Sequence, residues 1–138
     1  DERPLETFLE EDLLPFGEFT AGEGKTAILV SHNIVTCLDA QLPASLSPRV
    51  NAFLREILCF DGVVMTDGLD MGAVLEYAQD GDIAVTALLA GNDILLTCDY
   101  ETGIPAVLEA VAEGALTETM IDDACRRVLN WKQSLGLL

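Results

Sequence analysis

Three short apolar runs, separated by segments with helical signals, constrain the fold more than any other feature of this sequence. The runs cover residues 26–31, 62–66 and 93–97. None of them shows the polar–apolar alternation of a strand with one face in water, so each is expected to be covered on both faces. No hairpin signal joins one run to the next. Strands that alternate with helices predict a parallel sheet with right-handed crossovers.

Local signals predict where the helices begin and end. The dipeptide Ser47-Pro48 predicts the start of a helix that runs to about residue 59, because Ser caps a helix and Pro suits its first position. Four further helices are predicted: residues 5–19 with an interruption near Pro15, residues 83–90 capped by Asp80 or Asp82 and stopped by Gly91, residues 105–114 beginning at Pro105, and a helix from the Thr117 cap to about residue 135.

Charge and hydropathy exclude several classes of partner. The chain carries 24 acidic and 7 basic side chains, a formal charge of −17, with no Lys or Arg between Glu56 and Cys125. This excludes a nucleic-acid surface and disfavours attachment to anionic lipid. Half of the residues are hydrophobic and the mean hydropathy is +0.33, which excludes a disordered chain. No apolar run approaches the ~20 residues that a membrane span needs, so no membrane partner is expected.

The cysteines and the first residues of the sequence indicate the cellular compartment in which the protein is expected. Cys37, Cys59, Cys98 and Cys125 are widely spaced, and we expect them to be buried small hydrophobes in a reducing compartment. With His32 as the single histidine, neither a metal site nor a cofactor is expected. The first residues show neither the basic nor the apolar region of a signal peptide. The expected location is therefore the cytoplasm.

Polar clusters follow each apolar run, where the chemistry of a parallel α/β fold is placed. Both a doubly wound sheet and a (β/α) barrel carry their active sites at the carboxyl ends of the strands. Those ends hold His32, Asp67 and Asp99, and Asp67 directly follows a buried strand. Such a carboxylate needs a partner or a function. The alternatives are structural: Asp67 or Asp70 caps the next helix, His32 is a satisfied core histidine, and Asp99 is part of a solvated turn.

A longer stretch carries a resemblance to a known family. Residues 53–73, Phe-Leu-Arg-Glu-Ile-Leu-Cys-Phe-Asp-Gly-Val-Val-Met-Thr-Asp-Gly-Leu-Asp-Met-Gly-Ala, resemble the nucleophile signature of family 3 glycoside hydrolases, and within it the bacterial β-N-acetylhexosaminidases. Residues 5–16, 28–32 and 42–48 fit the same group. The chain departs from the family pattern at Ile57, Cys59 and Gly68, which are usually a polar residue, Gly and a second Asp.

The resemblance implies a fold that this chain would only partly contain. It implies the C-terminal portion of a (β/α)8 TIM barrel: about three parallel β/α units plus a C-terminal helix. Residues 1–138 would then form a single, partial catalytic domain that lacks the N-terminal half of the barrel. A complete barrel takes about 250 residues and eight strands, and three strands exposed at both edges are a pairing hazard. We therefore expect an N-terminal barrel fragment or a homo-oligomer as partner.

The resemblance also implies a reaction. Asp67 would be the nucleophile of a retaining hydrolysis of terminal β-linked N-acetylhexosamine glycosides, with His32 and Met71 near the sugar as shape or hydrogen-bond contacts. The family's acid/base group, a His paired with an Asp in an earlier Lys-His-Phe-Pro-Gly-His-Gly-type motif, has no counterpart in this sequence. Whether water or phosphate accepts the sugar stays open. The alternatives are a catalytically silent half-barrel acting as a structural or carbohydrate-binding module, and an unrelated doubly wound binding or response domain.

Overall fold

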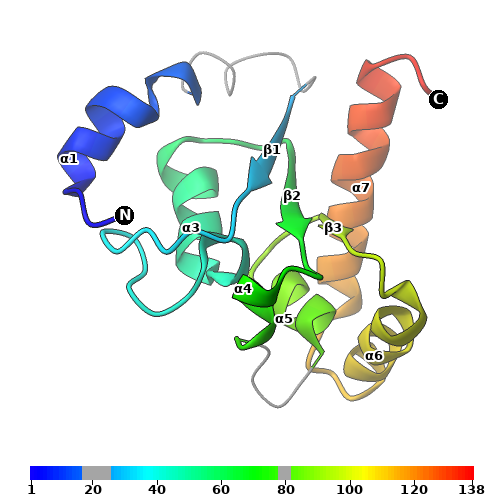
Figure 1. The fold of residues 1–138 in the computed structure, drawn as a ribbon. Helices are drawn as coiled ribbons and strands as arrows, with labels where there is room; N and C mark the ends of the chain where they lie inside the picture. Colours follow the sequence, from blue (N-terminus) through cyan, green and yellow to red (C-terminus); the bar gives the residue numbers. More distant parts are fainter. Residues whose placement is uncertain (17–25, 78–81) are drawn as a thin grey trace.

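The computed structural model describes residues 1–16, 26–77 and 82–138, and its centre is a three-stranded parallel sheet. The strands are β1 (Ala27–Val30), β2 (Val63–Gly68) and β3 (Ile94–Leu96), in the order β1-β2-β3. Figure 1 shows the strands at the centre of the molecule, with α3 on one side and α7 on the other. The predicted parallel α/β arrangement is confirmed over the described residues.

Helical segments precede, connect and follow these strands. Two of them contain a π-helical stretch that directly continues an α-helical one, so that α1 runs into η1 and α3 runs into η3. Within the described ranges, no helix is both long and apolar enough to cross a membrane. The segments are α1 (Leu5–Thr7), η1 (Phe8–Asp12), the 3-10 turn η2 (Ala44–Leu46), α3 (Pro48–Ala52), η3 (Phe53–Ile57), α4 (Gly72–Leu75), α5 (Ile83–Leu89), α6 (Tyr100–Ala112) and α7 (Glu118–Ser134).

Three of the predicted caps are present. The Ser47 hydroxyl accepts a hydrogen bond from the Val50 backbone N–H and donates one to the buried Asp39 carboxylate, at 2.7 Å. Asp82 caps α5 and Thr117 caps α7 in the same way. The other predicted cap of α5, Asp80, and residues 17–19 of the first predicted helix lie outside the described residues. The cap sites were predictable because they depend only on neighbouring residues.

The predicted start of the next helix at Pro105 is wrong. The helix α6 begins at Tyr100, five residues before Pro105. It begins there because the Asp99 side chain accepts a hydrogen bond from the Thr102 backbone N–H and so caps the helix. Asp99 is therefore a cap and not merely part of a solvated turn. Pro105 lies inside the helix, where its missing N–H gives up one backbone hydrogen bond.

The expected burial of the cysteines is also wrong. All four are free thiols, but Cys37 is half-buried and the other three are exposed. Cys59 follows the end of η3 with a φ of +52°, a conformation that favours the glycine usual at this position. Cys98 lies in the loop after β3, and Cys125 lies on the exposed side of α7. Their side chains therefore contribute little to the core.

Two apolar clusters pack against β2. The first joins β1 and β2 to α3 and η3, and the second joins the segment after β2 to η2, α4 and α5. On β2 itself, Val63, Val64 and Thr66 are fully buried. The first cluster is Ile28, Val30, Ala44, Val50, Leu54, Phe60 and Val64, and the second is Leu46, Leu69, Val74 and Ala87.

A buried carboxylate joins the elements at the amino ends of the strands. The Asp93 side chain is completely buried and forms ion pairs with Arg55 at 2.9 Å and Arg127 at 2.8 Å. It also accepts a hydrogen bond from the Val64 backbone N–H at 2.9 Å. Burial lowers the pKa of Arg55, and the charge of Asp93 opposes that shift. One side chain thus connects η3, β2, the start of β3 and α7.

We predict that Asp93→Asn strongly destabilises the chain. The substitution leaves two arginines without their counter-charge. We expect it to lower the unfolding free energy by about 3 kcal/mol. This is the low end of the range for a broken buried ion pair, because both guanidinium groups are partly exposed. The matched control is Asp123→Asn, which breaks the exposed pair with Arg126 and changes the unfolding free energy by less than about 1 kcal/mol. Urea unfolding measures both. Equal losses in the two variants would contradict the structural role of Asp93.

Candidate active site

Asp67 lies near the carboxyl end of the central strand, where a backbone N–H group holds one of its carboxylate oxygens. Its Oδ1 accepts a hydrogen bond from the Gly68 backbone N–H at 2.8 Å. Among the described residues, no hydrogen bond is made to Oδ2. The side chain is partly buried. A carboxylate in this arrangement can act as a nucleophile or accept a hydrogen bond from a ligand.

A β-bulge places Asp67. Met65 pairs with Ile94 and Gly68 pairs with Leu96, so three steps along β2 match two along β3. Within the bulge the Thr66 hydroxyl accepts a hydrogen bond from the Leu96 backbone N–H at 3.1 Å. Bulges bend a strand and redirect its side chains, and they are frequent beside active sites. The direction of Asp67 therefore depends on an extra residue in β2.

His32, at the end of β1, contacts the segment that follows Asp67. Its Nδ1 lies 2.7 Å from Ser45 Oγ and its Nε2 lies 2.8 Å from the Gly68 carbonyl oxygen. The ends of β1 and β2 are thus brought together. Both ring nitrogens are engaged within the protein, so a ligand would meet the carbon edge of the ring.

The loops after β2 and β3 are joined by Asp70. Its carboxylate accepts hydrogen bonds from the Thr97 hydroxyl at 3.2 Å and the Cys98 backbone N–H at 2.8 Å. The structural alternative in which Asp67 or Asp70 caps α4 is wrong, because the cap position is Met71 and no side chain bonds there. Met71 is half exposed beside the turn. Thus the three polar clusters do meet, although the sequence offered no signal that Asp70 makes the link.

The hydrogen bonds to Asp70 affect its ionisation. The Cys98 backbone N–H is the main group that lowers the pKa of the Asp70 carboxyl below its ordinary value, and the Thr97 hydroxyl adds to the effect. Asp70 is therefore ionised at neutral pH and is unsuited to donate a proton. It serves instead to hold two loops together.

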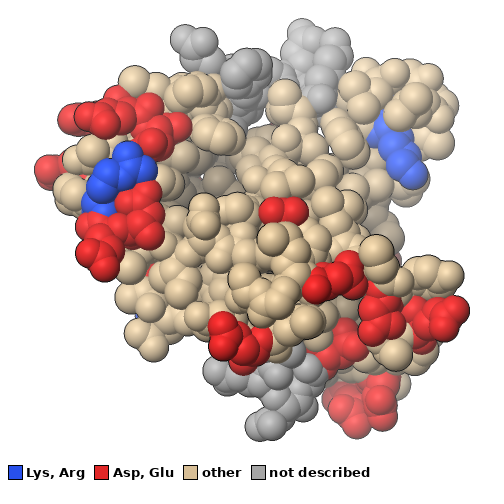
Figure 2. All heavy atoms as spheres, in the orientation of Figure 1, with Lys and Arg blue, Asp and Glu red and all other residues tan. Residues whose placement is uncertain are grey.

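The space beside these loops has both polar and apolar walls. A cavity of about 200 Å³ is lined by the carboxylates and hydroxyls of Asp70, Asp82, Thr97, Asp99 and Thr102 and by the apolar residues Leu69, Leu75, Ile83 and Ala84. Such groups bond well to hydroxylated, uncharged ligands. Figure 2 shows Asp and Glu gathered over α1 and around α6 on the face in view. Within the described residues, no group of three His, Cys, Asp or Glu side chains is arranged to hold a metal ion.

Comparison with known proteins gives a consistent result. The family model "Glycosyl hydrolase family 3 N terminal domain" matches residues 1–131. A β-hexosaminidase from Glaesserella parasuis serovar 5 is 35% identical over 112 residues, which cover 79% of this chain and 32% of that protein. A β-hexosaminidase from Methylococcus capsulatus is 32% identical over 80% of this chain and 33% of its own length. The chain spans about a third of the length of these relatives.

Two solved structures resemble the fold over nearly the whole chain. A glycoside hydrolase family 3 β-N-acetylglucosaminidase from Paenibacillus sp. FPU-7 has a TM-score of 0.88 and 35% identity, over 99% of this chain and 27% of that one. The β-N-acetylglucosaminidase from Thermotoga maritima has a TM-score of 0.86 and 29% identity, over 95% of this chain and 30% of that one. The α/β arrangement of three parallel strands and helices is therefore shared with both.

We predict that Asp70 makes stability depend on pH. Because the folded-state pKa of Asp70 is lowered, its contribution is complete above the unfolded carboxyl value, about pH 4, and is lost as the pH falls further. Asp70→Asn should therefore lower the unfolding free energy at pH 6–7, and the difference from wild type should shrink below about pH 4. Urea unfolding at a series of pH values measures this. Asp122→Asn, at an exposed position of α7, is the control for general charge effects, and a pH-independent Asp70→Asn difference would contradict the prediction.

Proposed function

The chain belongs to glycoside hydrolase family 3, and from that premise we propose that it carries the nucleophile of a retaining β-N-acetylhexosaminidase acting on terminal β-linked N-acetylhexosamine glycosides. One observation carries the proposal: at the carboxyl end of the central strand, Asp67 is partly buried, its Oδ1 is held by the Gly68 N–H, and none of the described residues bonds its Oδ2. The names of the relatives, β-hexosaminidase and β-N-acetylglucosaminidase, support the sugar class.

In the proposed first step, Asp67 attacks the anomeric carbon of the bound sugar. A bond forms between the carboxylate oxygen and that carbon while the bond to the leaving oxygen breaks, and an acid protonates the leaving group. The product is a glycosyl ester of Asp67. In the second step water attacks the same carbon, its proton passes to the base, and the Asp67 carboxylate is released.

The acid/base group is proposed to come from outside this chain. Asp70 is a poor donor because its pKa is lowered. His32, the one histidine, has both nitrogens engaged by Ser45 and Gly68. The chain spans about a third of its relatives' length, which leaves room for the second group elsewhere in a complete enzyme.

Met71 and His32 are proposed to shape the sugar site. Met71 is half exposed one turn after Asp67, where its thioether can pack against the apolar face of a sugar ring. For His32, the carbon edge of the ring remains for such a contact. The effect of Met71 would be on substrate affinity and fit rather than on proton transfer.

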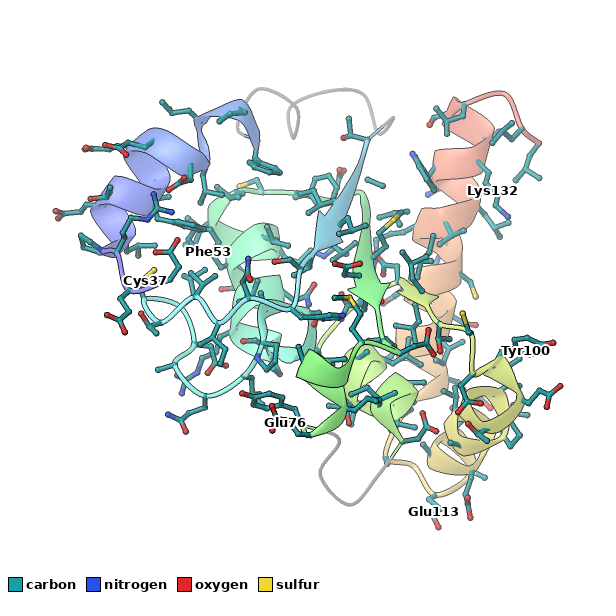
Figure 3. All side chains as sticks on the ribbon, viewed as in Figure 1. Cys37, Phe53, Glu76, Tyr100, Glu113 and Lys132 are labelled. Carbon is teal, nitrogen blue, oxygen red and sulfur yellow. The ribbon has the colours of Figure 1, made fainter. Side chains whose placement is uncertain are left out.

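We further propose that residues 1–138 form a partial catalytic domain, the closing units of a (β/α)8 barrel that a preceding barrel segment completes. The described sheet ends at β1 and β3, and each has an unpaired outer edge. Apolar side chains beside these edges are exposed, including Leu29 on β1 and Tyr100, Ile104 and Leu108 on α6. Figure 3 marks Tyr100 at the first turn of α6 and Glu113 at its end. The three α6 side chains are spaced four residues apart and so form one exposed apolar stripe on that helix, and such a stripe favours a protein partner.

The compartment is part of the proposal. The four free cysteines favour a reducing environment such as the cytoplasm. A homologue from Arthroderma benhamiae, 31% identical over 111 residues, is named an uncharacterized secreted glycosyl hydrolase.

A chimera tests the nucleophile. Residues 1–131 replace the matching segment of the Thermotoga maritima β-N-acetylglucosaminidase, and release of p-nitrophenol from its N-acetyl-β-glucosaminide is measured. We expect Asp67→Asn to lower kcat by about 10³-fold or more, the scale of a lost catalytic side chain. A 5-fluoro glycosyl donor should add its sugar mass to the Asp67 peptide in the unsubstituted chimera.

Asp61→Asn is the matched control, since it changes the same side chain at the opposite, exposed end of β2. It should leave kcat within about 3-fold of the chimera, because the charge is far from the reacting atoms. An active chimera that keeps its activity with Asp67→Asn refutes the assignment. A folded but inactive chimera that still binds N-acetylglucosamine favours the alternative of a silent carbohydrate-binding module.

A second test concerns the partner surface. The double substitution Ile104→Glu/Leu108→Glu should change the thermal stability of the isolated chain little, because both side chains are exposed there. It should clearly destabilise the chimera, where burying two carboxylates against a barrel neighbour costs several kcal/mol. Leu137→Glu, at another exposed leucine, is the control. Equal effects in chain and chimera, or a monomeric isolated chain whose cooperative unfolding matches that of the chimera, would contradict the proposal.

A further inference from the structure

The imidazole of His32 lies between a serine and a backbone carbonyl, and the carbonyl belongs to the residue after Asp67. Ser45 Oγ is 2.7 Å from Nδ1, and the Gly68 carbonyl oxygen is 2.8 Å from Nε2. Because a carbonyl oxygen only accepts hydrogen bonds, Nε2 must carry a proton. In the neutral ring Nδ1 then accepts from the Ser45 hydroxyl. The ring is thus fixed at both nitrogens.

The serine itself is held firmly. Its backbone N–H donates to the Ser31 carbonyl at 3.1 Å, and the neighbouring Ala44 N–H donates to the Asn33 carbonyl at 2.9 Å. The buried Asn92 side chain donates to the Ser45 carbonyl at 2.7 Å. Ser45 is completely buried. His32 is therefore anchored to a part of the structure that does not depend on the turn it supports.

The Gly68 carbonyl is the point where this support reaches the turn. It also accepts a hydrogen bond from the Met71 backbone N–H at 3.2 Å, which closes the turn from Gly68 to Met71. The other end of the same peptide unit, the Leu69 N–H, donates to the Leu96 carbonyl on β3 at 2.8 Å. The Gly68 N–H, one peptide earlier, holds Asp67 Oδ1. Movement of Gly68 would therefore move the Asp67 carboxylate.

We propose that His32 is a positioning residue: through its Nε2–H bond to the Gly68 carbonyl, backed by Ser45, it sets the turn that orients the Asp67 carboxylate. The effect of this role on catalysis rests on the proposed function, in which Asp67 is the nucleophile. It differs from a hydrogen-bonding contact with the sugar, for which neither ring nitrogen is left. It also differs from simple packing, since it depends on one N–H group.

The first experiment needs no activity. Since His32 is the only histidine, nitrogen NMR of the isolated chain reports its tautomer without ambiguity, and we expect the neutral ring to carry its proton on Nε2. Asp67→Asn should shift the Gly68 amide resonance of the isolated chain, because the Gly68 N–H is bonded to the Asp67 carboxylate. In His32→Phe, which keeps a planar ring without nitrogens, that Gly68 shift should be lost and the Met71 amide should exchange faster with solvent.

The second experiment uses the chimera described above. His32→Phe should lower kcat by about 10- to 100-fold, the effect of a misplaced reacting group, while KM stays within about 3-fold. His32→Gln, whose amide N–H can still donate to the carbonyl, should recover most of the loss. Asn33→Ala is the matched control, because this exposed neighbour bonds the other described residues through its backbone alone.

The outcomes separate the two proposals. If Asp67→Asn leaves the chimera active, the proposed function fails, whereas the Gly68 and Met71 amides still decide whether His32 sets the turn. Unchanged amides in His32→Phe, or a ring protonated on Nδ1 alone, overturn the positioning role. An effect of His32→Phe on KM alone, with kcat unchanged, overturns it in favour of a sugar contact. Equal kcat losses in His32→Phe and His32→Gln overturn it as well.

Discussion

The buried Asp93 carboxylate is the interaction on which the arrangement of the sheet depends. It stands at the beginning of β3 and binds Arg55 from η3, Arg127 from α7 and the Val64 backbone N–H from β2. The three partners come from three different elements, and Asp93 itself precedes β3. The Asp93 charge is therefore fully paired only when all four elements are correctly aligned. A misaligned strand would leave that charge buried and unpaired, which costs far more than the pair contributes. The ion pair therefore acts mainly by excluding other registers.

The alignment at the amino ends has consequences at the carboxyl ends. Asp93 aligns the amino ends of β2 and β3. From Met65 to Gly68, β2 uses one residue more than β3 over the same length, and the bulge accommodates this extra residue. The Thr66 hydroxyl accepts the Leu96 N–H that the irregular ladder would otherwise leave unpaired. The position of Asp67 is thus set from two sides, by the bulge and by the turn that His32 supports.

Sequence alone predicted what neighbouring residues determine. The three strands, the Ser47-Pro48 helix start and the resemblance that singles out Asp67 all depend on short, contiguous patterns. Pro105 was misjudged because a capping Asp six residues earlier starts the helix instead. Asp93 and Asp70 were missed because their partners are distant in sequence. A usable signal for Asp93 existed: an Asp opening an apolar strand, with an Arg at position 55 amid the apolar residues of a helix.

A retaining glycosidase needs one carboxylate ionised and a second group protonated at the same pH, so the two require different surroundings. In this chain the neighbouring Asp70 meets the first condition, because hydrogen bonds lower the pKa of its carboxyl. Backbone N–H groups donate hydrogen bonds to both carboxylates. The Gly68 N–H donates to Asp67, and the Cys98 N–H donates to Asp70 and lowers its pKa. A proton donor placed among them would lose its proton. If Asp67 is the nucleophile, the donor is best carried by a segment outside these residues, and the chain spans about a third of its relatives' length.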